Sequence, residues 1–213
     1  MSAVDEPRAG VVAPELAAEF PGLSLRFCVV ERGSGRSTPE IKARLAELAN
    51  RFSGAQAVNL RHQPIPWAYR VFFRHIGLDP DVSRTPPEQL ALERMRSGGF
   101  ASRNLLDDAL TIAVAESNVA IRALDADRVE GPPVLRPAAT GEALEGRPGE
   151  LEPGTLVLAD ERRPLALLFG AIASGRGVGP KTERTLLYAI GVKGVPSIAV
   201  EEGLWLASES MRS

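Results

Sequence analysis

The sequence is poor in the residue types that form covalent cross-links and metal clusters. It contains one cysteine, Cys28, and two histidines, His62 and His75. A single cysteine excludes an internal disulfide and a cysteine-based metal cluster. Neither histidine has a cysteine or a pair of acids at ligand spacing, so we expect no metal ion and no cofactor. The scarcity of cysteine favours a reducing, cytoplasmic setting.

Long apolar runs and aromatic residues are also scarce. Aromatic residues make up 5% of the chain although hydrophobic residues make up 44%, so aliphatic side chains and alanine must fill the core. No apolar run approaches the roughly 18 residues that a membrane helix needs. The first ten residues carry three charges and no apolar stretch, so we expect neither a membrane span nor a secretory signal.

The chain has no excess of basic residues. Its formal net charge is −2, which argues against strong non-specific RNA binding because phosphate neutralisation dominates such affinity. The cations are unevenly spread, however. Residues 61–74 contain three arginines and no acid, and residues 178–193 contain three cations against one acid. We therefore predict RNA contacts at Arg70, Arg74 and Lys181.

The order of the predicted elements indicates a segregated α+β fold. Apolar periodicity and end signals predict helices at 38–52, 65–76, 85–95, 104–116 and 196–207. Apolar and β-branched runs predict strands at 25–31, 119–124, 133–136, 155–159, 165–169 and 185–190. A strand, several helices, many strands and a last helix do not make a βαβ alternation. Cys28 lies inside the first strand and is expected in the core.

Three prolines interrupt the first residues. Pro7, Pro14 and Pro21 are expected to prevent regular structure there. We therefore predict two parts: a poorly ordered lead at 1–23 and a single domain at 24–213.

Three segments together resemble the tRNA-binding and editing domain of the phenylalanyl-tRNA synthetase beta chain. They are SRNLLDDALTIAVAESNVAIRALDADRVEG (102–131), VLRPAATGEAL (134–144) and LVLADERRPLALLFGAIASG (156–175). The resemblance extends from Arg61 onward and covers about two-thirds of the chain. It implies layered sheets packed together with helices outside, and a central pocket. In the synthetase, that pocket hydrolyses tyrosine wrongly attached to the phenylalanine tRNA.

The resemblance implies a set of ligand-binding residues but no catalytic residue that can be named. The set is Arg103, Asn104, Asp107, Arg122, Ser174 and Arg176. Four positions depart from the synthetase pattern: Ala109, Leu110, Arg122 and Gly175. In the synthetase, residues that take part in its reaction occupy these four positions. Since this chain has other residues there, we do not infer the tyrosine-specific reaction for it.

Three of these residues, Arg122, Asp107 and Asn104, also have a simpler interpretation. Arg122 could clamp a carboxylate or phosphate, or point outward as a solvated charge. Asp107 could serve the pocket or form a structural hydrogen bond to the next loop. Asn104 could bind an anion with Arg103 at the helix N-terminus, or act as a plain N-cap.

Two further motifs are weaker. The helix around Trp67, Phe72 and Phe73 could stack bases or contribute to the core. The loop SGRGVGPKT (174–182) lacks the spacing of a phosphate loop, and Pro180 removes a backbone donor. It is expected to form a mildly basic pocket lip. No G-x-S-x-G elbow is present, so a serine hydrolase has no support.

Three functions remain open from the sequence. The first is a tRNA-interacting domain that hydrolyses mischarged aminoacyl-tRNA in trans. The second is a protein that binds an amino-acid-like small molecule and has kept the fold without tRNA editing. The third is an interaction module without pocket chemistry. Ligation of an amino acid to tRNA by this chain alone is not expected, because it has no ATP-binding or class-defining aminoacylation motif.

Overall fold

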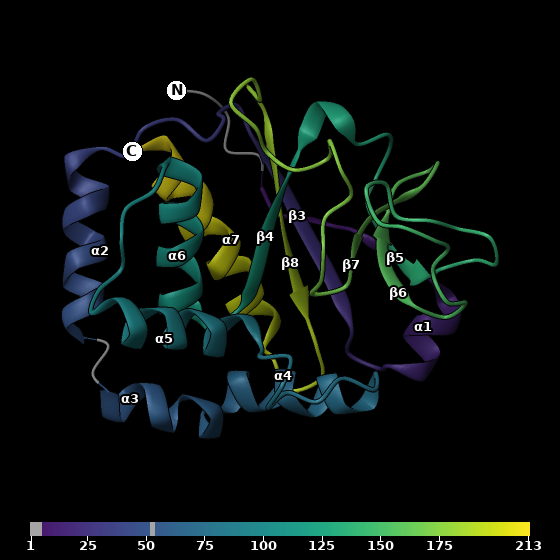
Figure 1. The fold of residues 1–213 in the computed structure, drawn as a ribbon, viewed down its shortest axis with the longest axis horizontal. Coiled ribbons are helices and arrows are strands. Elements are labelled where there is room, and N and C mark those ends of the chain that lie inside the picture. The colour runs from purple at the N-terminus through teal and green to yellow at the C-terminus, as the bar shows by residue number, and fades with distance from the viewer. Residues whose placement is uncertain (1–5, 52–53) are drawn as a thin grey trace.

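Two four-stranded sheets form the centre of the molecule (Figure 1). The computed structural model describes residues 6–51 and 54–213. The first sheet is antiparallel and contains, in order, β1 (Arg8–Ala9), β3 (Ser24–Val30), β8 (Thr185–Gly191) and β4 (Ala120–Asp125). The second contains β2 (Val11–Val12), β5 (Val134–Pro137), β6 (Leu156–Ala159) and β7 (Pro164–Leu167). In this arrangement β4 is an edge strand.

Apart from α1, which lies beside the second sheet, the helices cover the outer face and one end of the first sheet. Along the chain they are α1 (Pro14–Glu19), α2 (Pro39–Arg51), α3 (Gly54–Asn59), α4 (Pro64–His75), α5 (Pro86–Ser97), α6 (Leu105–Ser117) and α7 (Ser197–Arg212). Short 3-10 turns lie at η1 (Leu60–His62) and η2 (Ala126–Arg128). The layers run from α2 through α6 and α7 to the first sheet and then to the second, with α4 across one end (Figure 1). The predicted layered α+β fold is confirmed.

The central strand β8 separates two hydrophobic cores. Its seven residues are all buried. Leu186, Tyr188 and Ile190 pack in the core that includes the second sheet and α4. Leu187 and Ala189 pack on the other face, in the core with α6 and α7 that also holds Cys28. This alternation places a sandwich of sheets on one side and a helical layer on the other.

Capping hydrogen bonds define where α5 and α6 begin. The Thr85 amide N–H and hydroxyl both donate to Glu88 Oε2, at 3.3 and 2.7 Å, at the start of α5. Asn104 Oδ1 accepts from the Asp107 amide at 2.9 Å and caps α6. Both contacts follow the spacing seen in the sequence.

The structure differs from the sequence prediction mainly before residue 23. Within the described part, β1, β2 and α1 occupy this segment. Pro14 does not prevent α1 but begins it, because the first helical position needs no backbone N–H. The six-residue helix α3 was also not predicted, and α7 continues beyond residue 207. The division into a lead and one domain stays a prediction.

Helix α4 lies against the strand ends through its aromatic residues. Phe72 and Phe73 are buried, as the simpler reading of this helix expected. Trp67 is 46% exposed, and the Arg74 guanidinium lies 5.8 Å from its ring centroid. Over the described residues, no helix has the length and apolar character needed to cross a bilayer.

Candidate functional site

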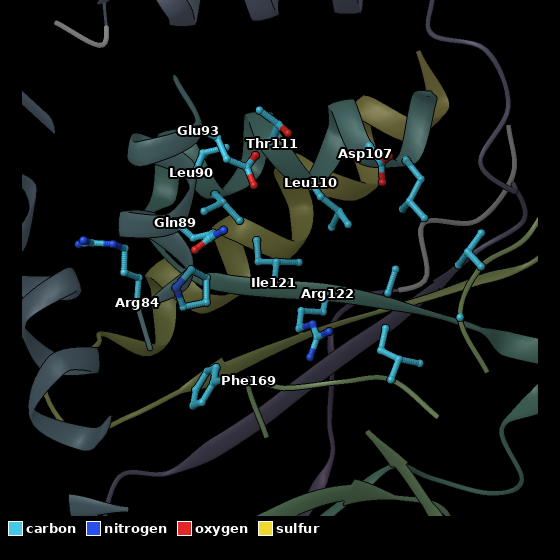
Figure 2. A pocket seen from close by; sticks show the side chains of 17 residues that line it. Arg84, Gln89, Leu90, Glu93, Asp107, Leu110, Thr111, Ile121, Arg122 and Phe169 are labelled. Atoms are coloured by element: carbon cyan, nitrogen blue, oxygen red, sulfur yellow. The ribbon is translucent and has the colours of Figure 1, made fainter. Parts of the chain in front are cut away.

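A cavity of about 600 Å³ lies along the free edge of β4 (Figure 2). Helices α5 and α6 form one wall, and β4 forms the floor with Ile121, Arg122 and Ala123. The segment after β7 closes the other side with Phe169, Ile172, Gly177 and Val178. The cavity therefore lies where the helical layer meets the gap between the sheets.

Arg122 is the cation at the floor of this cavity. Its Nη1 donates to the Gly170 carbonyl at 2.5 Å, and its side chain is half-buried. Figure 2 shows it directed from β4 toward the side on which Phe169 lies. Burial raises the pKa of the neighbouring Tyr188, and Arg122 opposes that rise. No carboxylate of the described residues forms an ion pair with Arg122, so its remaining donors can take an anionic or carbonyl group.

The helical wall carries polar groups opposite Arg122. Gln89 and Glu93 project from α5, and Asp107 and Thr111 project from α6. Asp107 accepts a hydrogen bond from Asn104 Nδ2 at 2.9 Å, which orients its carboxylate. Apolar side chains from α6 and β4, including Leu110 and Ile121, lie between these groups (Figure 2). The cavity is thus lined by two arginines, Arg122 and Arg84, by two carboxylates and by an apolar surface.

The structure brings two of the predicted site residues together in this cavity, Asp107 and Arg122. Asn104 caps α6 instead. Arg103 is exposed and does not line this cavity, but it lines a smaller neighbouring pocket that shares Asp107 and Thr111 with it. The structural hydrogen bonds considered for Asp107 are made by its neighbour Asp108. This buried carboxylate accepts from Ser37 Oγ at 2.5 Å, Ser102 Oγ at 2.6 Å and the Arg103 amide at 3.0 Å.

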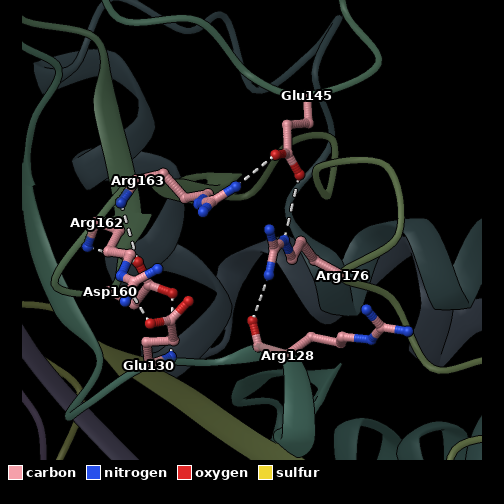
Figure 3. A network of polar contacts seen from close by, with 7 residues as sticks. All are labelled: Arg128, Glu130, Glu145, Asp160, Arg162, Arg163 and Arg176. Carbon is pink, nitrogen blue, oxygen red and sulfur yellow. Dashed lines mark hydrogen bonds and ion pairs between the residues drawn. The ribbon is translucent and has the colours of Figure 1, made fainter.

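Ser174 and Arg176 do not line the cavity, although their loop reaches it through Gly177 and Val178. Arg176 is engaged elsewhere, since Nε contacts Glu145 Oε2 at 3.2 Å and Nη1 donates to the Arg128 carbonyl at 2.7 Å. Glu145 also accepts from Arg163 Nη1 at 2.8 Å, so it joins two segments of chain (Figure 3). These two hydrogen bonds lower the pKa of Glu145. Arg176 therefore holds in place the loop whose residues Gly177 and Val178 line the cavity.

The predicted RNA contacts do not form one surface. Arg70 is only 4% exposed, and its guanidinium pairs with Glu88 at 2.7 Å and Asp81 at 2.6 Å. Its guanidinium is therefore engaged within the protein, and the RNA contact at Arg70 stays a prediction. Arg74 and Lys181 are exposed. They belong to α4 and to the loop before β8, which lie at opposite ends of the molecule (Figure 1).

Several cavity residues were not found from the sequence. Gln89 and Glu93, and likewise Asp107 and Thr111, are four residues apart and share a helix face, which is a detectable signal. Phe169 gave no such signal. Its φ of +58° is a left-handed conformation that a bulky residue rarely adopts, and only the coordinates reveal it.

Comparison with known proteins identifies the family. The sequence model of the B3/4 domain matches residues 68–201, which include both helices of the cavity wall and β4. The chain therefore belongs to the B3/4 domain family.

Similar curated proteins are beta subunits of phenylalanine–tRNA ligases. The subunit of Yersinia pestis is 34% identical over 100 residues, which are 45% of this chain and 12% of that protein. The subunit of Pasteurella multocida (strain Pm70) is 32% identical over 111 residues, or 50% of this chain and 14% of that protein. That of Mannheimia succiniciproducens is 34% identical over 102 residues, or 46% and 13%. The match thus spans about an eighth of the length of these relatives, and it confirms the resemblance read from the sequence.

Proposed function

We propose that this protein acts on tRNA, by binding the aminoacyl group of an aminoacyl-tRNA in the cavity beside β4 and hydrolysing its ester bond. The observation that carries the proposal is the composition of the cavity. Arg122 lies on one side, the carboxylates of Asp107 and Glu93 lie on the helical side, and apolar residues lie between them. This arrangement complements a carbonyl group, an α-ammonium group and an amino-acid side chain. The similarity to ligase beta subunits supports tRNA as the carrier.

The floor of the cavity can stabilise the charge that develops in ester hydrolysis. When water adds to the carbonyl carbon, the carbonyl oxygen becomes an oxyanion that needs positioned donors. Arg122 supplies charged donors next to that position. The backbone of edge strand β4 offers more. In such a strand, every second N–H group points away from the paired strand, here β8. The N–H group of Asp125 is one of these, because it donates to the Arg176 carbonyl at 2.9 Å. The N–H groups of Ile121 and Ala123 follow the same alternation.

The helical wall provides the base for this reaction. The cavity is lined by no histidine or cysteine, so a carboxylate must take the proton from the attacking water. Asp107 and Glu93 are the two candidates. One can accept that proton while the other holds the α-ammonium group. The bond between the carbonyl carbon and the ribose oxygen then breaks, and the ribose hydroxyl leaves with a proton.

The first prediction concerns the activity itself. Purified protein should release amino acid from at least one member of a panel of labelled aminoacyl-tRNAs. Arg122→Ala should lower the rate by more than tenfold, because it removes the charged donor at the oxyanion. Arg147→Ala is the matched control, since it removes an exposed arginine that lies outside the cavity, and its rate should equal that of the wild type.

Two results would contradict this proposal. Release no faster than in buffer for every aminoacyl-tRNA would remove the hydrolytic function. Equal rates for Arg122→Ala and wild type would remove the cavity floor from the reaction.

The second candidate is binding of a free amino-acid-like molecule. It is favoured by the burial of Arg70 and by the separation of Arg74 from Lys181, because the three predicted RNA contacts do not form one surface. Stabilisation against heat by free amino acids, without release from any aminoacyl-tRNA, would assign this function instead.

A further inference from the structure

A small groove lies on the other side of α5 and takes no part in the reaction described above. Its volume is about 220 Å³, and its walls are α5 on one side and α3 with η1 on the other. These helices lie with α4 at one end of the molecule (Figure 1). Helix α5 presents Gln89 and Glu93 to the cavity beside β4, but Glu88 and Leu92 to the groove. The cavity and the groove therefore occupy different faces of one helix.

One wall of the groove precedes the part of the chain that matches the B3/4 domain. The match begins at residue 68, whereas Ala57, Val58 and Arg61 line the groove from α3 and η1. The groove thus combines a helix of the family domain with a segment that the family model does not cover. Its ligand has to be inferred from its own side chains.

A buried arginine neutralises the two carboxylates of the groove. The guanidinium of Arg70 pairs with Glu88 at 2.7 Å and with Asp81 at 2.6 Å. The second oxygen of Glu88 accepts from the Thr85 hydroxyl at 2.7 Å. Because both carboxylates already face a cation, they repel an approaching anion less than free acids would.

Two further arginines of the groove are exposed, Arg61 and Arg84. Over residues 6–51 and 54–213, neither guanidinium makes a hydrogen bond or an ion pair. The hydrogen bond from Arg70 lowers the pKa of Asp81, and the charges of Arg74 and Arg61 add to this lowering, so Arg61 lies near the buried pair. Three arginines against two carboxylates give the groove a net charge of +1, in a chain whose net charge is −2.

The size and shape of the groove suit a phosphate group. The groove is smaller than the roughly 300–1,000 Å³ of a site for a drug-sized ligand, so it holds one small group. Arg61 comes from η1 and Arg84 from the loop before α5, which are two different walls. A phosphate can offer separate oxygens to guanidinium groups on two sides, whereas a carboxylate has two oxygens in one plane.

An aromatic ring lies on the neighbouring face of α4. Trp67 is 46% exposed, and the Arg74 guanidinium lies 5.8 Å from its ring centroid. Trp67, Arg70 and Arg74 are three and four residues apart, so they share one face of the helix. Proteins that bind single-stranded nucleic acid combine cations for the phosphates with aromatic rings on which bases stack. The ring therefore favours a phosphate that belongs to a nucleic-acid strand.

We infer that the groove between α3 and α5 binds a phosphate group through Arg61 and Arg84. Two sources share this chemistry, a phosphodiester of single-stranded RNA and free phosphate, and Trp67 favours the first. The inference goes beyond the proposed function and does not rest on it. Since Arg84 also lines the cavity beside β4, Arg61 is the residue that tests the groove alone.

Titration calorimetry with three probes tests the inference. The probes are inorganic phosphate, pentauridylate RNA, and a peptide nucleic acid of five thymines, which has no phosphates. The RNA should bind about tenfold tighter than the peptide nucleic acid. Arg61→Ala should weaken RNA and phosphate binding by about threefold or more, whereas Arg147→Ala, which removes an exposed arginine away from the groove, should not.

The salt dependence separates a phosphate contact from a structural effect. For the RNA, the slope of log K against log salt concentration should be smaller by about 0.7 in Arg61→Ala, because one phosphate contact is lost. Trp67→Ala should weaken RNA binding by about fivefold and leave the affinity for inorganic phosphate unchanged.

The outcomes also separate this inference from the proposed function. RNA binding that Arg61→Ala weakens with a smaller salt slope supports the inference and assigns the phosphate to RNA. Phosphate binding that depends on Arg61, with RNA bound no tighter, supports it and assigns free phosphate. Binding of neither probe, or equal affinities of Arg61→Ala and wild type, overturns it. Arg122→Ala should retain RNA binding, so a loss of hydrolysis in that variant leaves the groove unaffected.

Discussion

The hydroxyl of Tyr69 joins three elements at a single buried point. It donates to the Ile190 carbonyl of β8 at 2.6 Å and accepts from the Ala120 amide of β4 at 3.1 Å. Burial raises the pKa of this phenol strongly, so it stays neutral and keeps its proton. The residue inserts between two paired strands and fixes α4 to the beginning of β4. It thereby sets the end of the strand that carries Arg122.

Removal of this hydroxyl should destabilise the protein. Tyr69→Phe leaves the Ala120 N–H and the Ile190 carbonyl without their partner, and we expect a loss of about 1–3 kcal/mol in the free energy of unfolding. Chemical denaturation measures it. Tyr188→Phe is the comparison, because that hydroxyl meets the Arg122 side chain rather than two backbone groups. A loss below about 0.5 kcal/mol for Tyr69→Phe would show that the bridge adds nothing to stability.

Residue-level prediction succeeded where a chemical pattern lies within one element. The N-cap at Asn104 and the contact between Thr85 and Glu88 are local, and the structure forms both. Arg122 was placed in the cavity by resemblance and not by any local pattern. Arg70 shows the limit: its partners Glu88 and Asp81 lie on the next helix and the loop before it, so its burial depends on packing that the sequence does not display.

At the scale of elements, the long helices and buried strands were predictable, and the short ones were not. Helices such as α6 repeat an apolar face over several turns. By contrast, β1 and β2 have two residues each and exist only because β3 and β5 pair with them. The cavity lip depends on such pairing too, because the network of Glu145 with Arg163 and Arg176 places Gly177 and Val178 at the cavity (Figure 3).

The turn between β6 and β7 depends on a buried carboxylate. Asp160 accepts from the backbone N–H groups of Glu130 at 3.1 Å and of Arg162 and Arg163 at 2.9 Å each (Figure 3). Burial acts to raise the pKa of Asp160, but these hydrogen bonds outweigh it and hold the pKa below the ordinary value of 3.8. Because the folded-state pKa is the lower one, the carboxylate stabilises the fold fully above the unfolded value. That stability is lost as the pH falls through the folded value.

Acid unfolding should therefore report on this turn. The contribution of Asp160 to the free energy of unfolding should be constant above about pH 5 and should decrease below about pH 4. Asp160→Asn should cost about 1–2 kcal/mol at pH 7 and should flatten the decrease below pH 4. Denaturant titrations at a series of pH values measure both effects, with Asp127→Asn as an exposed control. Parallel profiles for Asp160→Asn and wild type would exclude Asp160 as a source of the acid sensitivity.

At the scale of the whole molecule, the proposed function implies a ligand that is recognised mainly by its aminoacyl end. The net charge is −2, which argues against strong non-specific RNA binding. The two predicted RNA contacts that are exposed, Arg74 and Lys181, lie on segments at opposite ends. The cavity beside β4, by contrast, brings two arginines, two carboxylates and apolar side chains together in one place. The central claim is therefore that the cavity beside β4 binds the aminoacyl end of the ligand.

A crystal structure of the protein bound to a 3′-aminoacylamino-3′-deoxyadenosine tests this claim most directly. We expect the aminoacyl carbonyl to lie beside Arg122 and its ammonium group to face Asp107 or Glu93. Ligand density at any other surface, with the cavity beside β4 empty, would contradict the proposed function.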